Sequence, residues 1–106
     1  MAIDLAEIRD SLAKSHIIWK KHAFEKAIER GIRRTSIQEI VYNGEIIEDY
    51  PRDTPYPGLL ILGWHQNQPL HVVIAYDELT NYCFIITVYQ PDSDHFENDY
   101  KMRKRR

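Results

Sequence analysis

Apolar residues recur at helical spacing in the first part of the chain and form near-continuous runs in the later part. Within residues 3–14, Leu5, Ile8 and Leu12 lie three or four positions apart, with charged residues between them. This spacing predicts an amphipathic helix. Residues 15–20 are expected to link this helix to the next, with their apolar side chains in the core or at an interface.

A second helix is expected over residues 20–30. On helical geometry Phe24, Ala27 and Ile28 share one side, which is predicted to be the apolar side. Gly31 suits the left-handed position that ends a helix. Ionisable side chains gather on another side, namely those of His22, Lys26, Glu29 and Arg30.

A third helix is predicted to begin near Ser36 and to end at Gly44. Ser36 and Glu39 have the spacing of a capping box, in which the two side chains cap each other's backbone N–H groups. Glycine after asparagine is a common helix stop, since it adopts conformations that other residues avoid. The stripe expected to be buried consists of Ile37, Ile40 and Val41.

Strand patterns follow. Residues 45–50 are predicted to form a short strand, and the proline-rich stretch 51–57 a loop. Residues 58–65, 69–76 and 81–90 are apolar, β-branched and aromatic, with short polar connectors between them, as in an antiparallel meander. These runs are too apolar to have one face in water, so the helices should cover one face. A partner, a second copy or the C-terminal segment should cover the other.

These elements predict an α+β fold: two or three N-terminal helices on a three- to four-stranded antiparallel sheet, with a basic C-terminal segment. We expect one domain over residues 1–106. It divides into an N-terminal helix (1–19), a helical pair (20–44), the sheet (45–90) and the basic C-terminal segment (91–106), which is either a short helix or a loose tail.

Composition indicates what kind of protein this is and in which cellular compartment it is expected. Hydrophobic residues make up 43% of the chain, which is typical of a folded globule. No apolar run approaches the roughly 20 residues that span a bilayer. The acidic start lacks the pattern of a secretory signal, and the lone Cys83 is expected to be a buried thiol. We therefore expect a cytoplasmic protein that does not contact a membrane.

Charge is unevenly distributed although the net charge is only −2. Residues 14–34 hold seven Lys and Arg against two Glu, and residues 101–106 hold five more Lys and Arg. Residues 35–58 hold five Asp and Glu against one Arg. Such a chain can present a face for a polyanion while it stays acidic overall.

The commonest enzyme motifs are missing, including nucleotide-binding glycine loops, CxxC, HExxH and GxSxG. Five histidines are present, and no pair has a metal-ligand spacing such as H-x3-H. His65 and His71 flank a hairpin across which they can approach each other. We expect no metal and no other cofactor, with a metal-dependent hydrolase as a third alternative that chelators would test.

Acid–base cleavage of a phosphodiester needs fewer converging groups than a metal site does. One group removes the 2′-hydroxyl proton, another protonates the leaving 5′-oxygen, and cations stabilise the phosphorane. His22 and Arg30 on one helical side, His71 on a strand, and Arg103 or Arg105 near the C-terminus supply these types. Each also has an ordinary structural interpretation: a surface or capping histidine, a hydrogen-bonded histidine at a sheet edge, and a solvated basic tail.

An ordered series of short motifs runs through the chain: His22-Ala23 entering a helix that ends Glu29-Arg30-Gly31-Ile32, then Asn43-Gly44-Glu45 to Tyr50-Pro51, Pro57-Gly58, Pro69-Leu70-His71-Val72-Val73 and Ile86-Thr87-Val88-Tyr89. This order resembles the domain-of-unknown-function family 4258, over nearly the whole chain from His22 to Arg105. That family looks like the RelE and BrnT type of small bacterial toxins, which are often encoded beside a zinc-finger antitoxin of the YgiT or MqsA kind.

The resemblance implies the toxin of a type II toxin–antitoxin system: a metal-independent endonuclease acting on messenger RNA, including ribosome-bound messenger. Carried over by position, it implies catalytic roles for His22, Arg30, His71, Arg103 and Tyr89. The RNA backbone is expected to contact Lys21, Lys26, Arg33, Arg34, Lys101, Lys104 and Arg105. The expected protein partner is the cognate antitoxin.

A different class is also compatible with the sequence. The apolar sheet predicts equally a non-catalytic interaction module that binds a partner protein or forms a homodimer. The nuclease interpretation depends on the fold bringing the basic turn at residues 29–34 and the C-terminal basic residues to the same side of the sheet as an imidazole.

Overall fold

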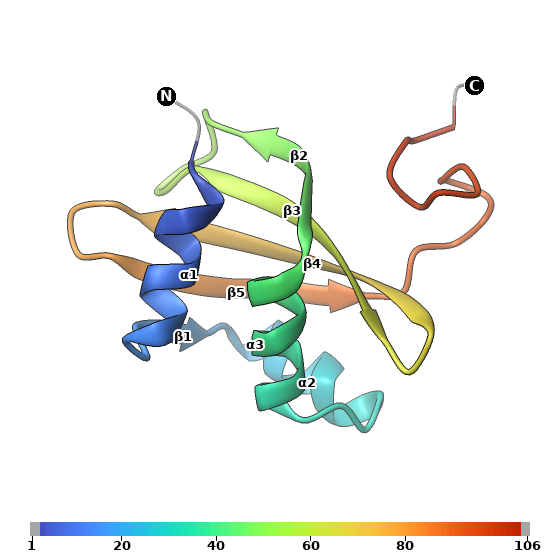
Figure 1. The fold of residues 1–106 in the computed structure, drawn as a ribbon, viewed down its shortest axis with the longest axis horizontal. Coiled ribbons are helices and arrows are strands. Elements are labelled where there is room, and N and C mark those ends of the chain that lie inside the picture. Colours follow the sequence, from blue (N-terminus) through green and yellow to red (C-terminus); the bar gives the residue numbers. More distant parts are fainter. Residues whose placement is uncertain (1–2, 105–106) are drawn as a thin grey trace.

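The structure, a computed structural model, describes residues 3–104. Three helices and five strands form there (Figure 1). No helix in this range is long and apolar enough to cross a bilayer. The elements in chain order are α1 (Leu5–Ala13), β1 (Ile17–Trp19), α2 (Lys21–Glu29), α3 (Arg34–Asn43), β2 (Glu45–Tyr50), β3 (Gly58–His65), β4 (Gln68–Asp77) and β5 (Tyr82–Tyr89).

The sheet is mixed and has the strand order β1-β5-β4-β3-β2. Strands β2 to β5 form the expected antiparallel meander, whereas β1 pairs with β5 in parallel. The prediction of a purely antiparallel sheet of three or four strands was therefore wrong in both respects. The missed strand lies in the segment interpreted as a link. Three residues are too few to show a period, and β1 is held by backbone pairing to the open edge of β5.

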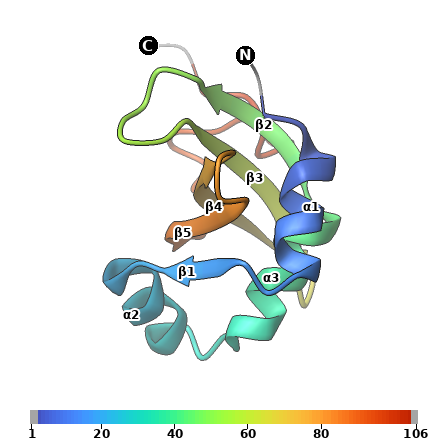
Figure 2. The same ribbon diagram turned by 90° about the vertical axis from the view of Figure 1, so that its left-hand side faces the viewer.

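Helices α1 and α3 lie against one face of the sheet, as Figures 1 and 2 show. Between them and the sheet lies the main core, where Ile8 and Ile37 meet the inward side chains of the strands. The expected thiol is buried there, and burial raises the pKa of Cys83 to about 12.

Helix α2 packs beside the sheet, but the side of the helix that is buried differs from the one predicted. Ala23 and Ala27 are buried, whereas Phe24 and Ile28 are 38% and 65% exposed. The expected apolar side of Phe24, Ala27 and Ile28 was thus wrong for two of its three members. Small alanines allow the helix backbone to approach its neighbours, which the larger side chains would prevent.

The predicted end of the second helix is confirmed, whereas the predicted start of the third helix is wrong. Gly31 has φ +65°, as expected for the left-handed residue that follows a helix. Helix α3, however, begins at Arg34, and its N-cap Arg33 makes no side-chain capping bond. Ser36 is already the third residue of the helix, so the predicted capping box with Glu39 does not form.

The second face of the sheet is partly covered by the chain itself. Leu60 and Leu62 point to this face and are 0% and 3% exposed. The segment after β5 lies over it, with Phe96 packed edge-on against the His71 ring at 4.5 Å between centroids. The C-terminal segment, one of the three covers that the sequence left open, therefore lies over part of this face.

Position 44, at the end of α3, requires glycine for a steric reason. Its backbone conformation is not the reason, because a φ of −79° suits any residue. A Cβ there would lie 2.6 Å from the Ile40 carbonyl oxygen and 2.9 Å from that of Leu62. We expect Gly44→Ala to lower the free energy of unfolding by about 1–3 kcal/mol in urea titrations, through overpacking. Gly31→Asn is the matched control, because no atom lies within 4 Å of its Cβ and asparagine tolerates positive φ. Equal stability of Gly44→Ala and the wild type would contradict the close approach of α3 to β3.

Candidate functional site

Five polar side chains converge on the second face of the sheet. Strand alternation brings three strands into the cluster: His71 of β4 lies opposite Tyr89 of β5, and Glu48 and Tyr50 of β2 point to the same face. The C-terminal segment adds Arg103. We call these five residues the second-face cluster.

His71 is the most buried member, with no exposed surface. Its Nε2 lies 2.7 Å from the carbonyl oxygen of Tyr100, and its Nδ1 lies 3.1 Å from the hydroxyl of Tyr89. A carbonyl only accepts, so Nε2 carries the proton and donates it. In the neutral ring Nδ1 is then the acceptor, and the Tyr89 hydroxyl donates to it.

Arg103 and Glu48 form a two-pronged ion pair. The guanidinium donates from Nε to Oε2 at 2.8 Å and from Nη2 to Oε1 at 3.2 Å. The hydroxyl of Tyr50 donates to the same carboxylate. The arginine side chain is 55% exposed and that of the glutamate 22%. The pair therefore closes the outer side of the cluster while it keeps its cation in contact with solvent.

Burial and charge set the protonation states. Burial lowers the pKa of His71 below 6.5. Burial and the adjacent Glu48 raise the pKa of Tyr50 to about 12. Burial raises the pKa of Glu48, but hydrogen bonds from Arg103 and Tyr50 outweigh this and lower it overall. At neutral pH the cluster thus combines a neutral imidazole, a carboxylate, a guanidinium and protonated phenols.

Three of the predicted catalytic residues meet in this cluster, namely His71, Tyr89 and Arg103. His22 and Arg30 do not. His22 is exposed on α2, and Arg30 lines a cavity of about 220 Å³ with His65, beside the β3–β4 turn. In Figures 1 and 2, α2 and the C-terminal segment lie at opposite ends of the molecule.

The predicted RNA-binding residues are spread over separate surfaces. On and after α2, Lys26 pairs with Glu29 and Arg34 lies over the Phe24 ring. On the C-terminal segment, Lys101 pairs with Glu45. The expectation that both basic segments share one side of the sheet is wrong, because α2 packs beside β5 while the C-terminal segment packs toward β2. Of the remaining four predicted RNA-binding residues, three are exposed: Lys21, Arg33 and Lys104. The fourth, Arg105, lies outside the described residues.

Sequence reasoning missed Glu48 and Tyr50. The available signal was their i, i+2 spacing in a predicted strand, which places both on one face. Nothing in the sequence identified Arg103 as their partner, because that contact joins positions 55 residues apart.

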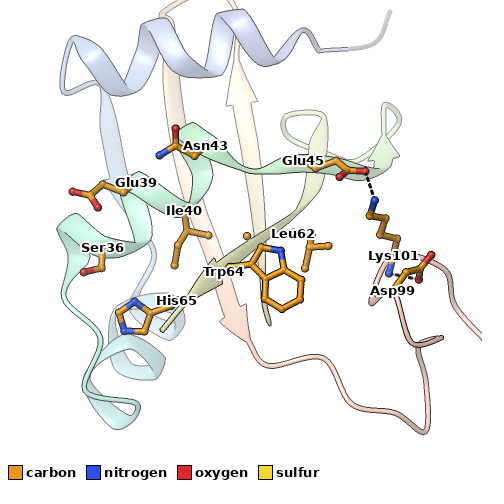
Figure 3. A pocket seen from close by; sticks show the side chains of 11 residues that line it. Ser36, Glu39, Ile40, Asn43, Glu45, Leu62, Trp64, His65, Asp99 and Lys101 are labelled. Carbon is orange, nitrogen blue, oxygen red and sulfur yellow. Dashed lines mark hydrogen bonds and ion pairs between the residues drawn. The ribbon is translucent and has the colours of Figure 1, made fainter. Parts of the chain in front are cut away.

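A wide cleft beside α3 does not suit a phosphate. It encloses about 670 Å³ between α3, the end of β3 and the C-terminal segment, with Trp64 in its middle (Figure 3). Carboxylates of Glu39, Glu45 and Asp99 line it against a single lysine, Lys101. An anionic ligand is repelled there.

Metal binding has no obvious centre within residues 3–104. No group of three or more His, Cys, Asp or Glu side chains in this range is arranged to hold an ion. His65 and His71 do not face each other across the hairpin, since they pair with Gln68 and Leu62 respectively. The second-face cluster offers proton donors and acceptors and one guanidinium, which is paired with Glu48 and half exposed to solvent.

Comparison with protein families matches residues 19–90 to the family described as Domain of unknown function (DUF4258). No curated protein and no solved structure matches the chain. The matched range contains Glu48, Tyr50, His71 and Tyr89 and ends before Arg103.

The fold should lose stability on acidification because of His71. The unfolded chain takes up a proton near pH 6.5 and the folded chain only at a lower pH, so between these values the unfolded state binds more protons. The contribution of His71 is complete above pH 6.5 and is lost as the pH falls toward the lowered pKa. Urea titrations at about pH 7.5 and about pH 5.5 should show this loss.

The matched variants for this measurement are His71→Gln and His22→Gln. We expect His71→Gln to show a smaller loss between the two pH values than the wild type. His22 is exposed, so His22→Gln should keep the wild-type difference. An unchanged pH dependence in His71→Gln would show that the imidazole is not the responsible group.

Proposed function

The chain belongs to the family of the domain of unknown function DUF4258, and from the geometry of the second-face cluster we propose that it is a metal-independent RNA endonuclease. The main observation in support of this proposal is that a phenol–imidazole pair and a guanidinium–carboxylate pair meet on one face of the sheet. Perturbed titratable groups gather preferentially at functional sites. The expected substrate is messenger RNA, and the expected role is that of a type II toxin.

Tyr89 is the proposed base for the 2′-hydroxyl. Because His71 has no exposed surface, it acts through the half-buried Tyr89, whose hydroxyl donates to Nδ1. The tyrosine oxygen receives the 2′-hydroxyl proton while the tyrosine passes its own proton to the imidazole. His71 is therefore a positioning residue and a proton acceptor behind the catalytic phenol.

Arg103 is the proposed phosphate-binding group. Two of its five N–H donors bind Glu48, which leaves three for the oxygens of the phosphorane. Tyr50 keeps its proton at neutral pH, since its pKa is about 12, and can donate it to the leaving 5′-oxygen. The products are a 2′,3′-cyclic phosphate and a 5′-hydroxyl. Tyr89 ends the step with one proton, as it began; exchange with water then removes the extra proton from His71 and returns a proton to Tyr50.

The basic residues between the start of α2 and the start of α3 have a different role in this proposal. Lys21, Arg33 and Arg34 are exposed. They lie on α2 or near the start of α3, and α2 is at the other end of the molecule from the C-terminal segment (Figure 1). We assign them to a second contact with the backbone of an RNA that extends beyond the cleaved bond, where they contribute affinity without chemistry. His22 and Arg30 are assigned no catalytic role.

Variants of the cluster test the chemistry. With labelled RNA and a chelator present, we expect Arg103→Ala to cleave about 10²–10³-fold more slowly, as for loss of a transition-state donor. Tyr89→Phe should lose about 10²–10⁴-fold, as for a general base. Arg30→Ala is the matched control and should cleave at nearly the wild-type rate. Wild-type rates in both cluster variants would mean that the cluster is only structural.

Expression in a bacterial host tests the toxin role. The wild-type chain should arrest growth and deplete messenger RNA, and Tyr89→Phe at equal protein level should not. Co-expression of the neighbouring gene product, expected to be a zinc-finger antitoxin, should restore growth. Normal growth and intact messenger with the wild-type chain would remove the toxin proposal.

A non-catalytic interaction module is the second candidate, and exposed apolar side chains on α2 favour it. Ile28 is 65% exposed and Phe24 38%. Binding of a partner protein or a second copy through this surface should survive high salt and be lost in Phe24→Ser/Ile28→Ser. RNA binding through several cations should instead weaken steeply as salt rises. If Tyr89→Phe leaves every phenotype intact while the α2 variant abolishes it, this second function is correct.

A further inference from the structure

A small groove opens on the second face of the sheet, next to the cluster. It encloses about 200 Å³ and has an apolar floor that includes Val73, Ala75 and Ile86. One wall is flat and aromatic, because Tyr56 of the β2–β3 loop stacks on Phe84 of β5, with 5.0 Å between ring centroids and 8° between planes.

Two opposite charges border this apolar groove. Lys20 places its ammonium 5.4 Å from the centroid of the Phe84 ring, and Asp53 lines the loop side. Both residues are exposed. Within residues 3–104 neither side chain has a hydrogen-bond or ion-pair partner, so both are available to a ligand.

The groove and the second-face cluster share a border at Gly58. This residue pairs with Tyr50 of the cluster, and it also lines the groove. A Cβ built on Gly58 would lie 3.5 Å from the Asp53 carboxylate and 3.6 Å from the Tyr50 ring. A ligand in the groove therefore lies close to the ring of Tyr50, the residue proposed as proton donor.

We propose that this groove binds a guanine base of the RNA beside the cleaved bond; the inference rests on the proposed nuclease function, which supplies the RNA. The groove is smaller than the roughly 300–1,000 Å³ of typical ligand pockets and suits one planar ring system. Aromatic walls stack bases of any kind. Discrimination comes from Asp53, whose two oxygens match the adjacent N1–H and N2–H donors of guanine. Adenine and cytosine offer only one donor group on that edge. Lys20 binds the attached phosphate.

Nucleotide titrations test the binding without cleavage. Guanosine 3′-monophosphate added to the ¹⁵N-labelled full chain should shift the amide signals of Lys20, Tyr56 and Phe84, and it should bind about tenfold more tightly than adenosine 3′-monophosphate. Asp53→Asn should remove this preference. The matched control Asp49→Asn, at an exposed carboxylate of β2, should keep it. Equal affinity for both nucleotides, or shifts confined to other surfaces, would overturn the guanine site.

Mapping of RNA ends separates this inference from the nuclease itself. The wild-type chain should cut next to guanines, and Tyr56→Ala, in the loop, should cut about tenfold less selectively with a cleavage chemistry that still depends on Tyr89. Cleavage without guanine preference overturns the groove and leaves the nuclease. Guanine binding in the groove without any RNA cleavage overturns the nuclease and leaves a nucleotide-binding site. Thermal unfolding of each variant confirms that it is folded.

Discussion

The contact of the C-terminal segment with the sheet is the constraint on which the second face depends. A buried imidazole is stable only when both ring nitrogens have partners. For His71 one partner comes from β5 and the other from the backbone of Tyr100. The ion pair of Arg103 with Glu48 holds that backbone in place. Without the segment, the face would expose apolar strands and an imidazole with an unsatisfied N–H.

The same contact determines the electrostatics of the proposed site. Arg103 keeps Glu48 ionised, and burial keeps His71 neutral. The cluster therefore offers a proton acceptor and a cation at neutral pH, which acid–base cleavage of a phosphodiester requires. The neighbouring cleft carries an excess of carboxylates and repels a polyanion, so the proposed RNA site is placed at the cluster and the groove beside it.

Burial of His71 also limits how the site can work. An imidazole with no exposed surface cannot touch a substrate, so its chemical effect must pass through Tyr89. The hydroxyl of that residue is oriented by the acceptor nitrogen behind it. In this arrangement structure and proposed catalysis use the same hydrogen bonds, and the residues covering the histidine are also those that fix its tautomer.

Local pattern alone determined much of this protein. Three helices, the four antiparallel strands and the left-handed Gly31 follow from periods and turn residues that act over a few positions, and all are present. His71 and Arg103 were named as candidates from their residue types, and Tyr89 from the family resemblance. Tertiary structure alone decided the rest. The three-residue β1 has no readable period and exists through its pairing with β5. The buried side of α2 depends on how closely alanines allow it to approach, and the pairing of Glu48 with Arg103 joins distant parts of the chain. Which charges meet is set by the packing of whole elements, and no local spacing encodes that.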